Sequence, residues 1–426
     1  MKNSKTIEFK NLVGTNDILT DLIRTSAREM IACAVEAELQ EFMAQYMELQ
    51  DSNGKRRIVR NGYLPERGIT TSVGAIPVKV PRIRDRESQT EAIKFDSKII
   101  PKHLRRSASM QELLPLLYLK GISTNDFADT LSPILGEGAR NISAGVVSKL
   151  KSCWEQEYTT WCKRSLAGKN YVYIWADGIY LQARMDDCKN CVLVIIGVNP
   201  DGVKELLGLE IGFRESKESW KSMLLELKAR GLTISPLLAI GDGALGFWGA
   251  LHEVYPTTKQ QRCWVHKTAN ILDKLPKALH VSAKKAIHEI YMSEDRTMAR
   301  KMLKKFITKY GSKYPKAAEC LLKDEEALLA FYDFPGAHWT HIRTTNPIES
   351  TFATVRHRTY KSKGCFSQQT ILTMVFKLCQ GAEQRWKKLY GYAELEKLVN
   401  GSKYVDGIHV ENASSNNETK EVRKAA

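Results

Sequence analysis

The chain has 426 residues, of which 43% are hydrophobic, and a formal net charge of +16 from 64 basic and 48 acidic side chains. This length exceeds one ordinary domain, so we expect two to four units with buried cores. No apolar run reaches the roughly 18 residues that span a bilayer, and the first residues lack the apolar segment of a signal peptide. We therefore expect neither a membrane protein nor an exported one. The odd number of nine scattered cysteines favours a reduced, cytoplasmic protein.

The basic excess is concentrated near the N-terminus. Residues 1–50 carry five basic and eight acidic side chains, whereas residues 51–110 carry fourteen and six, a net charge of −3 against +8. Half of the excess therefore lies in about a seventh of the chain, which is typical of a polyanion-binding surface. A solvated basic face without a partner is the alternative.

The first predicted element is a long amphipathic helix over residues 15–46, because apolar side chains recur there at helical spacing. It is interpreted as a packing or oligomerisation surface. A polar loop over residues 50–66 follows, and its cations Arg56 and Arg57 are predicted to contact phosphate.

Residues 67–83 alternate in the manner of a β-hairpin that turns at Gly74. Arg82 and Arg84 extend this strand pattern. We predict a flexible basic arm whose arginines follow a DNA groove or backbone.

Residues 110–165 are predicted to form a helix-turn-helix domain. Gly121 separates two apolar helical segments, and a third helix carries Lys149 and Lys151. A last helix that bears cations after a turn is the arrangement of a recognition helix. Many three-helix units bind nothing, and only the basic charge favours DNA binding here.

The periodicity changes at Tyr171. Strands are predicted over residues 171–177, 179–184, 191–198, 205–213, 236–241 and 259–263, with helices over 216–230 and 246–254. Antiparallel strands that lead into α/β units are typical of an RNase H-like core. Residues 264–335 are predicted to be helical throughout and rich in lysine and arginine.

Three acidic residues mark the candidate site. Asp177 and Asp242 each end an apolar run and are followed by glycine, which allows a sharp turn. Glu349 lies just inside a predicted helix start, where Asn346 is the expected cap and Pro347 the first helical residue. Three carboxylates brought together repel one another unless divalent cations neutralise them, and hard oxygen ligands select Mg²⁺ or Mn²⁺. A single Asp-Gly step is more often an ordinary turn, but three acids in these contexts predict phosphoryl transfer on nucleic acid.

Five separated segments then occur in an order that resembles the Mutator-type transposases of bacterial insertion sequences. They are Asp177–Tyr180, Ile196–Gly202, Gly241–Trp248, Gln261–Lys267 and Thr344–Phe352. The resemblance covers roughly residues 15–400. It implies a DDE transposase with an RNase H-like core, whose triad corresponds to Asp177, Asp242 and Glu349. It also implies an all-helical insertion and the recognition of terminal inverted repeats.

The role of the Cys263-x-x-His266 step is open. With two further cysteines, Cys188 and Cys191, it could complete a zinc site. We favour a role in the wall of the active site or in a DNA contact. Trp339 could stack on an unpaired base, although a core tryptophan is an equal alternative.

The predicted activity is metal-dependent DNA strand cleavage and strand transfer with two Mg²⁺ or Mn²⁺ ions per site. Arg356 and Arg358, which follow Glu349, are predicted to hold phosphates. The expected partners are double-stranded DNA of the element ends and the target, and further copies of the chain, in the bacterial cytoplasm at the nucleoid. A DNA-binding protein without catalysis, such as a repressor or an inactive transposase derivative, is the alternative.

The expected organisation has six parts. An N-terminal helix with a basic hairpin and loop occupies residues 1–109, and the helix-turn-helix domain follows over 110–165. The RNase H-like core has a first part over 166–266 and final helices over 341–405, separated by the all-helical insertion at 267–340. A disordered tail is expected over 406–426.

Overall fold

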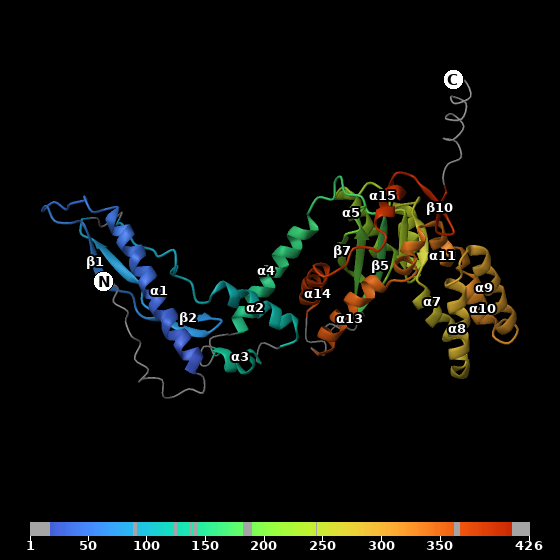
Figure 1. Cartoon of the computed structure of the whole chain (residues 1–426), viewed down its shortest axis with the longest axis horizontal. Helices are drawn as coiled ribbons and strands as arrows, with labels where there is room; N and C mark the ends of the chain where they lie inside the picture. Colours follow the sequence, from blue (N-terminus) through green and yellow to red (C-terminus); the bar gives the residue numbers. More distant parts are fainter. Residues whose placement is uncertain are drawn as a thin grey trace, which may run out of the picture. The chain divides into compact units, whose positions relative to one another are not determined.

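The computed structural model describes residues 18–87, 92–122, 126–135, 139, 144–181, 190–243, 245–361 and 367–410. The chain divides into two compact units, residues 1–150 and 151–426 (Figure 1). No helix in the described part of the chain is both long and apolar enough to cross a membrane.

The first unit begins with the predicted amphipathic helix, α1 (Ile18–Ala44), which buries Val35 and Leu39. This helix packs against an antiparallel hairpin of β2 (Arg67–Thr71) and β3 (Gly74–Val78). The hairpin and its turn at Gly74 are as predicted. Gly74 has a φ of +111°, and the Arg24 guanidinium occupies the space that a Cβ would need, so a larger residue would be strained there.

The predicted second strand of that hairpin is divided in the structure. Residues beyond Val78 leave β3, and β4 (Pro81–Asp85) pairs antiparallel with β1 (Ile58–Tyr63) instead. The predicted flexible arm is therefore wrong for residues 81–85, because the backbone of β4 is paired with β1.

Three helices follow, as predicted: α2 (Ala108–Leu119), α3 (Phe127–Leu135) and α4 (Ala144–Cys162). Most of the residues between them, 123–125, 136–138 and 140–143, lie outside the described part of the chain. The border between the two units falls within α4, so the helix-turn-helix assignment stays a prediction.

The second unit is built on a mixed five-stranded sheet in the order β7-β6-β5-β8-β9. Its strands are β5 (Tyr173–Leu181), β6 (Asn190–Val198), β7 (Lys204–Phe213), β8 (Leu238–Gly241) and β9 (Lys259–Arg262). β5, β6 and β7 are antiparallel neighbours, whereas β8 and β9 run parallel to β5. This sheet confirms the mixed α/β class expected from the periodicity.

The predicted strand break at Asp177 is wrong. β5 continues through Asp177 and Gly178 because β6 pairs with it as far as Leu181. On its other side, the parallel pairing with β8 ends at Ala176 opposite Gly241. Asp177 therefore lies just beyond the point where its parallel neighbour stops.

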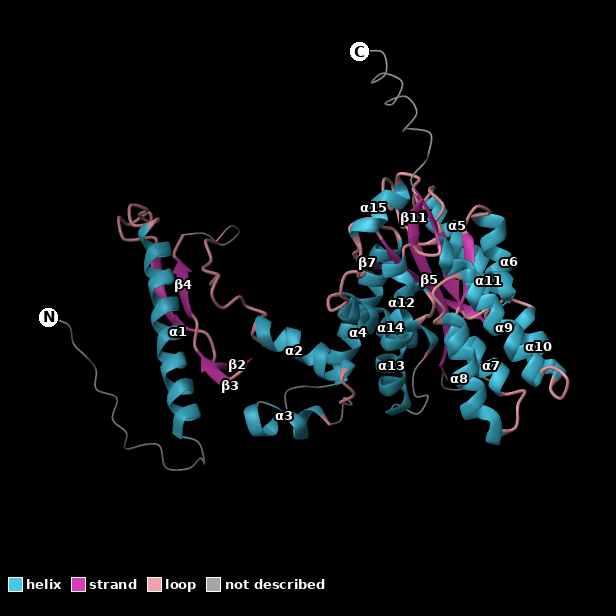
Figure 2. Ribbon diagram, turned by 45° about the vertical axis from the view of Figure 1, so that its right-hand side comes forward, coloured by secondary structure: helices cyan, strands magenta, loops and turns pink. Residues whose placement is uncertain are grey.

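Helices cover both faces of this sheet (Figure 2). On one face, α5 (Lys217–Ala229) and α6 (Leu245–Val254) bury Trp220 and Phe247 against strand residues such as Ile174 and Ala176. The alternate residues of β5 point to the other face, where the Trp175 indole donates to the His341 carbonyl at 3.1 Å. α13 (Asn346–Lys361) packs there against β5, and α14 (Gln368–Glu383) packs against β7.

The stretch between β9 and α13 is helical, as predicted. It contains α7 (Trp264–Leu272), η3 (Lys277–Leu279), α8 (His280–Tyr291), α9 (Arg296–Tyr310), α10 (Pro315–Leu322), α11 (Glu325–Leu329), η4 (Ala330–Asp333), η5 (Gly336–His338) and α12 (Trp339–Ile342). α8, α9 and α10 form a block that packs on α7.

The last described elements are α15 (Ala393–Val399) and a hairpin of β10 (Lys403–Val405) and β11 (Ile408–Val410). Residues 406–410 were expected in a disordered tail, and this boundary is wrong. Asp406 accepts a hydrogen bond from the Arg296 backbone at 2.8 Å, and Gly407 forms backbone hydrogen bonds with Tyr332 and Gly336. Residues 411–426 lie outside the described part.

Candidate active site

Asp177 is the most buried of the three predicted acids, with 8% of its surface exposed. Its Oδ1 accepts a hydrogen bond from the Gly178 backbone at 2.8 Å. Burial raises the pKa of Asp177 to about 7, with further contributions from Glu215 and Asp242, although His266 opposes the shift. The carboxylate is thus unfavourable in its ionised form unless a cation joins it.

Asp242 follows the last residue of β8, which places it beside Asp177 at the same end of the sheet. Gly243 has a φ of +83°, and the Arg262 guanidinium fills the space beside its Cα. Only glycine fits this turn without displacing Arg262. Burial also raises the pKa of Asp242, against the favourable charges of His266 and Arg262.

Glu349 lies in the first turn of α13. The helix begins at Asn346, so this residue is not the flanking cap that was predicted, and Pro347 is the second residue of the helix. The Thr345 carbonyl accepts a hydrogen bond from the Glu349 backbone at 3.0 Å. This early start turns the Glu349 side chain toward α7, as its contact with His266 shows.

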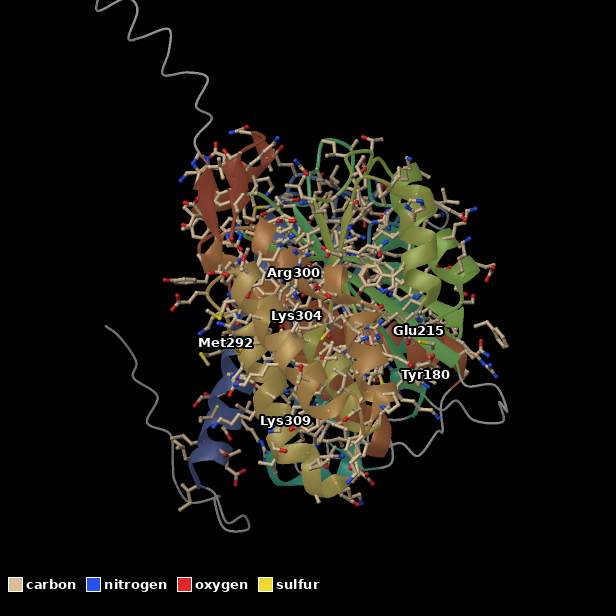
Figure 3. The ribbon with its side chains drawn as sticks, turned by 90° about the vertical axis from the view of Figure 1, so that its right-hand side faces the viewer. Tyr180, Glu215, Met292, Arg300, Lys304 and Lys309 are labelled. Atoms are coloured by element: carbon tan, nitrogen blue, oxygen red, sulfur yellow. The ribbon has the colours of Figure 1, made fainter. Side chains whose placement is uncertain are left out.

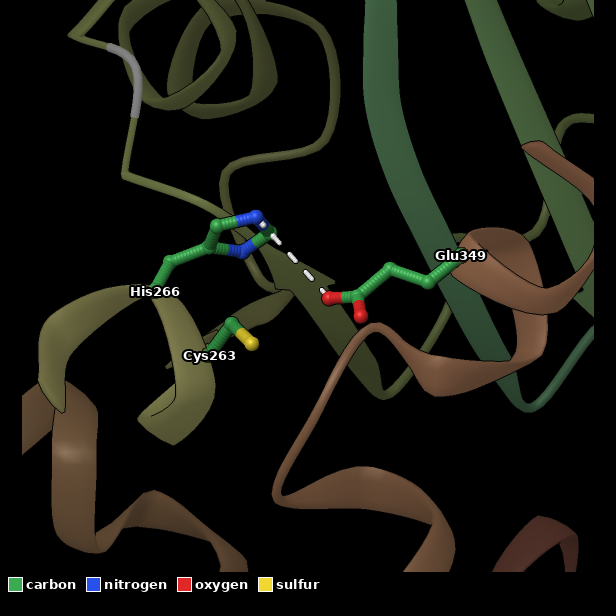
Figure 4. A group of neighbouring side chains, drawn as sticks. All are labelled: Cys263, His266 and Glu349. Carbon is green, nitrogen blue, oxygen red and sulfur yellow. Dashed lines mark ion pairs between the residues drawn. The ribbon is translucent and has the colours of Figure 1, made fainter. Parts of the chain in front are cut away.

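His266 links two of the acids. Its Nδ1 lies 3.5 Å from Asp242 Oδ1. Its Nε2 lies 3.8 Å from Glu349 Oε1, the pair that Figure 4 marks with a dashed line. The hydrogen bond with Cys263 is the largest cause that raises the pKa of His266 to about 9, and the charges of Asp242 and Asp177 add to it. A positively charged imidazole therefore stands among the three carboxylates at neutral pH.

Cys263 anchors this wall of the site. It is fully buried before the first turn of α7, and its backbone N–H donates to the Gly241 carbonyl at 2.9 Å. The Cys263 Sγ in turn accepts from the Thr345 backbone N–H at 3.4 Å. The end of β8, the start of α7 and the start of α13 are thereby held together.

A buried hydroxyl occupies the centre of this wall. Donor atoms of Cys263, His266 and Glu349 lie within 4.8 Å of one another and could in principle hold a metal ion. However, Thr345 Oγ1 lies 2.8 Å from Glu349 Oε1 and 3.4 Å from both His266 Nδ1 and Cys263 Sγ. This hydroxyl donates to Glu349 and lies within contact distance of the other two groups, which favours a structural role for the Cys-x-x-His step.

The structure does not support the zinc alternative that paired Cys263 and His266 with two further cysteines. Cys188 lies outside the described residues. Cys191 is buried in β6, where its Sγ would be 2.6 Å from a Cβ built on Gly178. The Cys191 thiol thus packs against Gly178 on the face of the sheet that α5 and α6 cover.

Sequence reasoning missed a fourth carboxylate. A Cβ built on Gly178 would lie 2.6 Å from Glu215 Oε1, so Glu215 reaches the residue next to Asp177. The Tyr180 hydroxyl donates a hydrogen bond to Glu215 (Figure 3). Burial raises the pKa of Glu215, and the Asp242 charge adds to this shift. The sequence around Glu215 reads as an ordinary strand-to-helix turn, which is why no signal pointed to it.

The predicted DNA contacts in the first unit differ in their surroundings. Arg56, Arg82 and Arg84 are all exposed. Of these three, Arg82 also donates a hydrogen bond to the Asn61 carbonyl at 2.8 Å. Arg57 makes two hydrogen bonds to Asp85, at 2.8 and 3.0 Å. Its guanidinium joins β1 to β4, so a structural role competes with the predicted phosphate contact.

The remaining predicted residues lie on helices. Lys149 is exposed and Lys151 half-buried on α4, while Arg356 is exposed on α13 with its guanidinium 5.8 Å from the Phe352 ring. The Arg358 side chain lies outside the described residues. Trp339 is half-buried and donates to the Phe334 carbonyl at 2.9 Å. This packing favours the core alternative over base stacking.

Comparison with known proteins agrees with the order of the motifs. The family model described as "Transposase, Mutator family" matches residues 2–389. The transposase for insertion sequence element IS6120 of Mycolicibacterium smegmatis is 51% identical over 278 residues, which cover 65% of this chain and 85% of that protein. The transposase for IST2 of Acidithiobacillus ferrooxidans is 51% identical over 287 residues, 66% of this chain and 95% of that protein.

A more distant relative extends the similarity. The transposase for IS905 of Lactococcus lactis is 29% identical over 359 residues, which cover 84% of this chain and 88% of that protein. The family match spans both structural units and all five motifs. This chain is a member of the Mutator family of transposases.

Proposed function

We propose that this chain is a DDE transposase that binds the inverted repeats of its own element and catalyses metal-dependent strand cleavage and strand transfer. Asp177, Asp242 and Glu349 form its catalytic triad, on an RNase H-like core interrupted by the helical block between β9 and α13. The observation that carries this proposal is the convergence of the three acids around His266, from a strand, a strand end and a helix start.

The donor set suits divalent cations. Asp177, Asp242 and Glu215 all have raised pKa values because burial and neighbouring carboxylates disfavour their ionised forms. Carboxylate oxygens are the ligands that Mg²⁺ and Mn²⁺ prefer, and Asp177, Asp242 and Glu349 would hold two such ions. When bound, these ions activate the attacking oxygen and stabilise the leaving oxygen of the phosphodiester.

The side chains of this protein supply position and charge. Asp177 must lose its proton to become a ligand, because burial raises its pKa to about 7. Thr345 orients the Glu349 carboxylate by donating to its Oε1. His266 offsets part of the negative charge through its contacts with Asp242 and Glu349.

Two successive displacements at phosphorus account for the reaction. A water oxygen attacks the phosphodiester at the element end, the bond between phosphorus and the 3′ oxygen breaks, and the element keeps a 3′-hydroxyl. That hydroxyl then attacks a target phosphodiester and displaces a second 3′ oxygen. No bond between protein and DNA forms, so no serine or tyrosine nucleophile is required.

Joining two ends requires at least two copies of the chain, and α1 is the proposed interface. It exposes large apolar side chains, among them Ile18 at 57% and Met30 at 65%. Apolar residues exposed on a long helix are typical of an oligomer contact. Light scattering of the chain with Met30→Glu, compared with wild type, tests this part; an unchanged mass contradicts it.

The decisive experiment measures cleavage of a labelled element-end duplex in Mg²⁺ or Mn²⁺ by wild type and Asp242→Asn. A nick at the element end by the wild type alone supports the proposal. Binding by both proteins without a nick by either supports the alternative, a DNA-binding protein without catalysis. Cleavage by both proteins would remove Asp242 from the triad.

A further inference from the structure

We propose that the helical insertion binds the phosphate backbone of duplex DNA through one face of α9. This lysine face consists of Lys301, Lys304, Lys305 and Lys309. The inference rests on the proposed function and deepens it, because it assigns a DNA contact to residues that belong neither to the proposed triad nor to the first unit.

The lysine face follows from the geometry of α9. Ala299, Leu303, Phe306 and Tyr310 are its buried residues, and their spacing of three and four residues defines one side of a helix. At about 100° per residue, the four lysines fall on the opposite side. All four are exposed, and Lys304 and Lys309 lie one beyond the other along the helix (Figure 3).

The charge of this segment is one-sided. Residues 296–318 contain eight lysines and arginines and no aspartate or glutamate. Arg296 pairs with Asp333, and Arg300 pairs with Glu325 and Glu326. Within the described part of the chain, the four lysines of the face form no ion pair. The two arginines therefore stabilise the helical block through ion pairs. The four lysines of the lysine face can bind an external anion.

An ordinary solvated helix face would carry mixed charges, because pairs of opposite sign four residues apart stabilise a helix and like pairs destabilise it. In α9, Arg300 precedes Lys304, Lys301 precedes Lys305, and Lys305 precedes Lys309, each by four residues. These repulsions lower the stability of the free helix. A polyanion bound along the face would relieve them.

The insertion connects this face firmly to the active site. α7 begins directly after Cys263, and its first turn carries His266. α8 and α10 pack on α7, and α9 packs on both α8 and α10. DNA held by α9 is therefore held by the same packed block that forms the wall beside Asp242 and Glu349.

The chemistry of the face fits a phosphate backbone rather than a base sequence. Lysine presents a mobile point charge and lacks the rigid fork with which arginine reads bases. Lys301 and Lys309 are separated by about 12 Å along the helix at 1.5 Å per residue, a length that spans several phosphate charges of duplex DNA. The contact should therefore be independent of sequence.

The test uses the full-length protein with Lys304→Gln, Lys305→Gln and Lys309→Gln together. The control carries Lys387→Gln, Lys388→Gln and Lys403→Gln, which remove the same charge from exposed lysines outside the insertion. Fluorescence anisotropy measures binding to an element-end duplex and to an unrelated duplex, in EDTA, over a series of salt concentrations. Circular dichroism confirms that both variants are folded.

We expect the α9 variant to bind both duplexes about tenfold more weakly at moderate salt, and the slope of log affinity against log salt to fall by about two to three. The control should bind like wild type. Equal binding by the α9 variant and the control overturns the inference, as does a loss confined to the element-end duplex, which would indicate a sequence-specific contact. The proposed function stands in both cases if the wild type cleaves its element end; if the wild type binds no duplex, both proposals fail.

Discussion

The hydroxyl of Thr345 donates a hydrogen bond to Glu349 across 2.8 Å and contacts the Cys263-x-x-His266 step on its other side. Thr345 is fully buried. This contact gives the Cys-x-x-His step a physical role, because it holds Glu349, the third acid of the proposed triad, near the end of β8.

Replacing Thr345 by valine should therefore impair cleavage about 10- to 100-fold, the usual cost of losing a group that orients a metal ligand. The valine keeps the volume but leaves Glu349 and His266 without the shared hydroxyl. Strand cleavage measured over a Mn²⁺ titration should show a higher metal requirement. Thr345→Ser, which keeps the hydroxyl, should restore most activity; a serine variant as poor as valine would point to packing alone.

The stability of Asp177→Asn should depend on pH in a defined direction. The folded pKa of Asp177 is raised to about 7 from a usual value of 3.8, so the wild type loses stability as pH rises from about 4 to 7. Asparagine has no such dependence. Urea unfolding in EDTA should show the variant more stable at pH 8, by up to a few kcal/mol at about 1.4 kcal/mol per pKa unit, and little different at pH 4.

In the presence of Mn²⁺, the wild type should become more stable at pH 8 than Asp177→Asn. Mn²⁺ should raise the unfolding midpoint of the wild type at pH 8, because it binds the folded state only, and should leave Asp177→Asn almost unchanged. Equal stabilisation of both proteins would place the metal elsewhere.

Substitutions at two glycines of similar backbone conformation should distinguish the cost of backbone strain from the cost of a steric clash at the candidate site. Gly243 has a φ of +83° and meets Arg262, whereas Gly168 has a φ of +75° and nothing within 4 Å of the point that a Cβ would occupy. Gly168→Ala should cost about 1 kcal/mol of stability. Gly243→Ala should cost more and abolish cleavage, because Arg262 must move away from Gly243 and from Asp324, which it contacts at 2.9 Å. Similar thermal midpoints and full activity for both variants would contradict this view of the turn.

Substitutions of two arginines in the first unit should have different effects, one on thermal stability and the other on DNA binding. Arg57 holds the pKa of the Asp85 carboxyl well below its usual range through their hydrogen bonds, and Arg57→Gln should lower the thermal midpoint. Arg84→Gln should leave the midpoint unchanged and weaken DNA binding, because Arg84 is exposed. A variant of Arg57 with normal stability and weaker binding would restore the phosphate contact predicted for it.

Local patterns in the sequence predicted the strands of the five-stranded sheet and the helical character of the stretch between β9 and α13, but not the hairpin of β10 and β11. They also marked Asp177, Asp242 and Glu349 as the candidate acids. These features depend on the periodicity of apolar residues and on turn residues, which act over a few positions. The same local reasoning placed a strand break at Asp177, because it could not know that β6 pairs past this residue while β8 stops before it.

Only the tertiary structure decided which side chains meet. Thr345 and Cys263 are 82 positions apart in the sequence. Glu215 follows the C-terminal end of β7 and reaches Gly178 of β5. Arg57 is separated from Asp85 by 28 positions, and their pairing gives this predicted DNA contact a competing structural role. Such contacts arise when sheet register and helix packing bring distant segments together, and no short-range pattern carries that information.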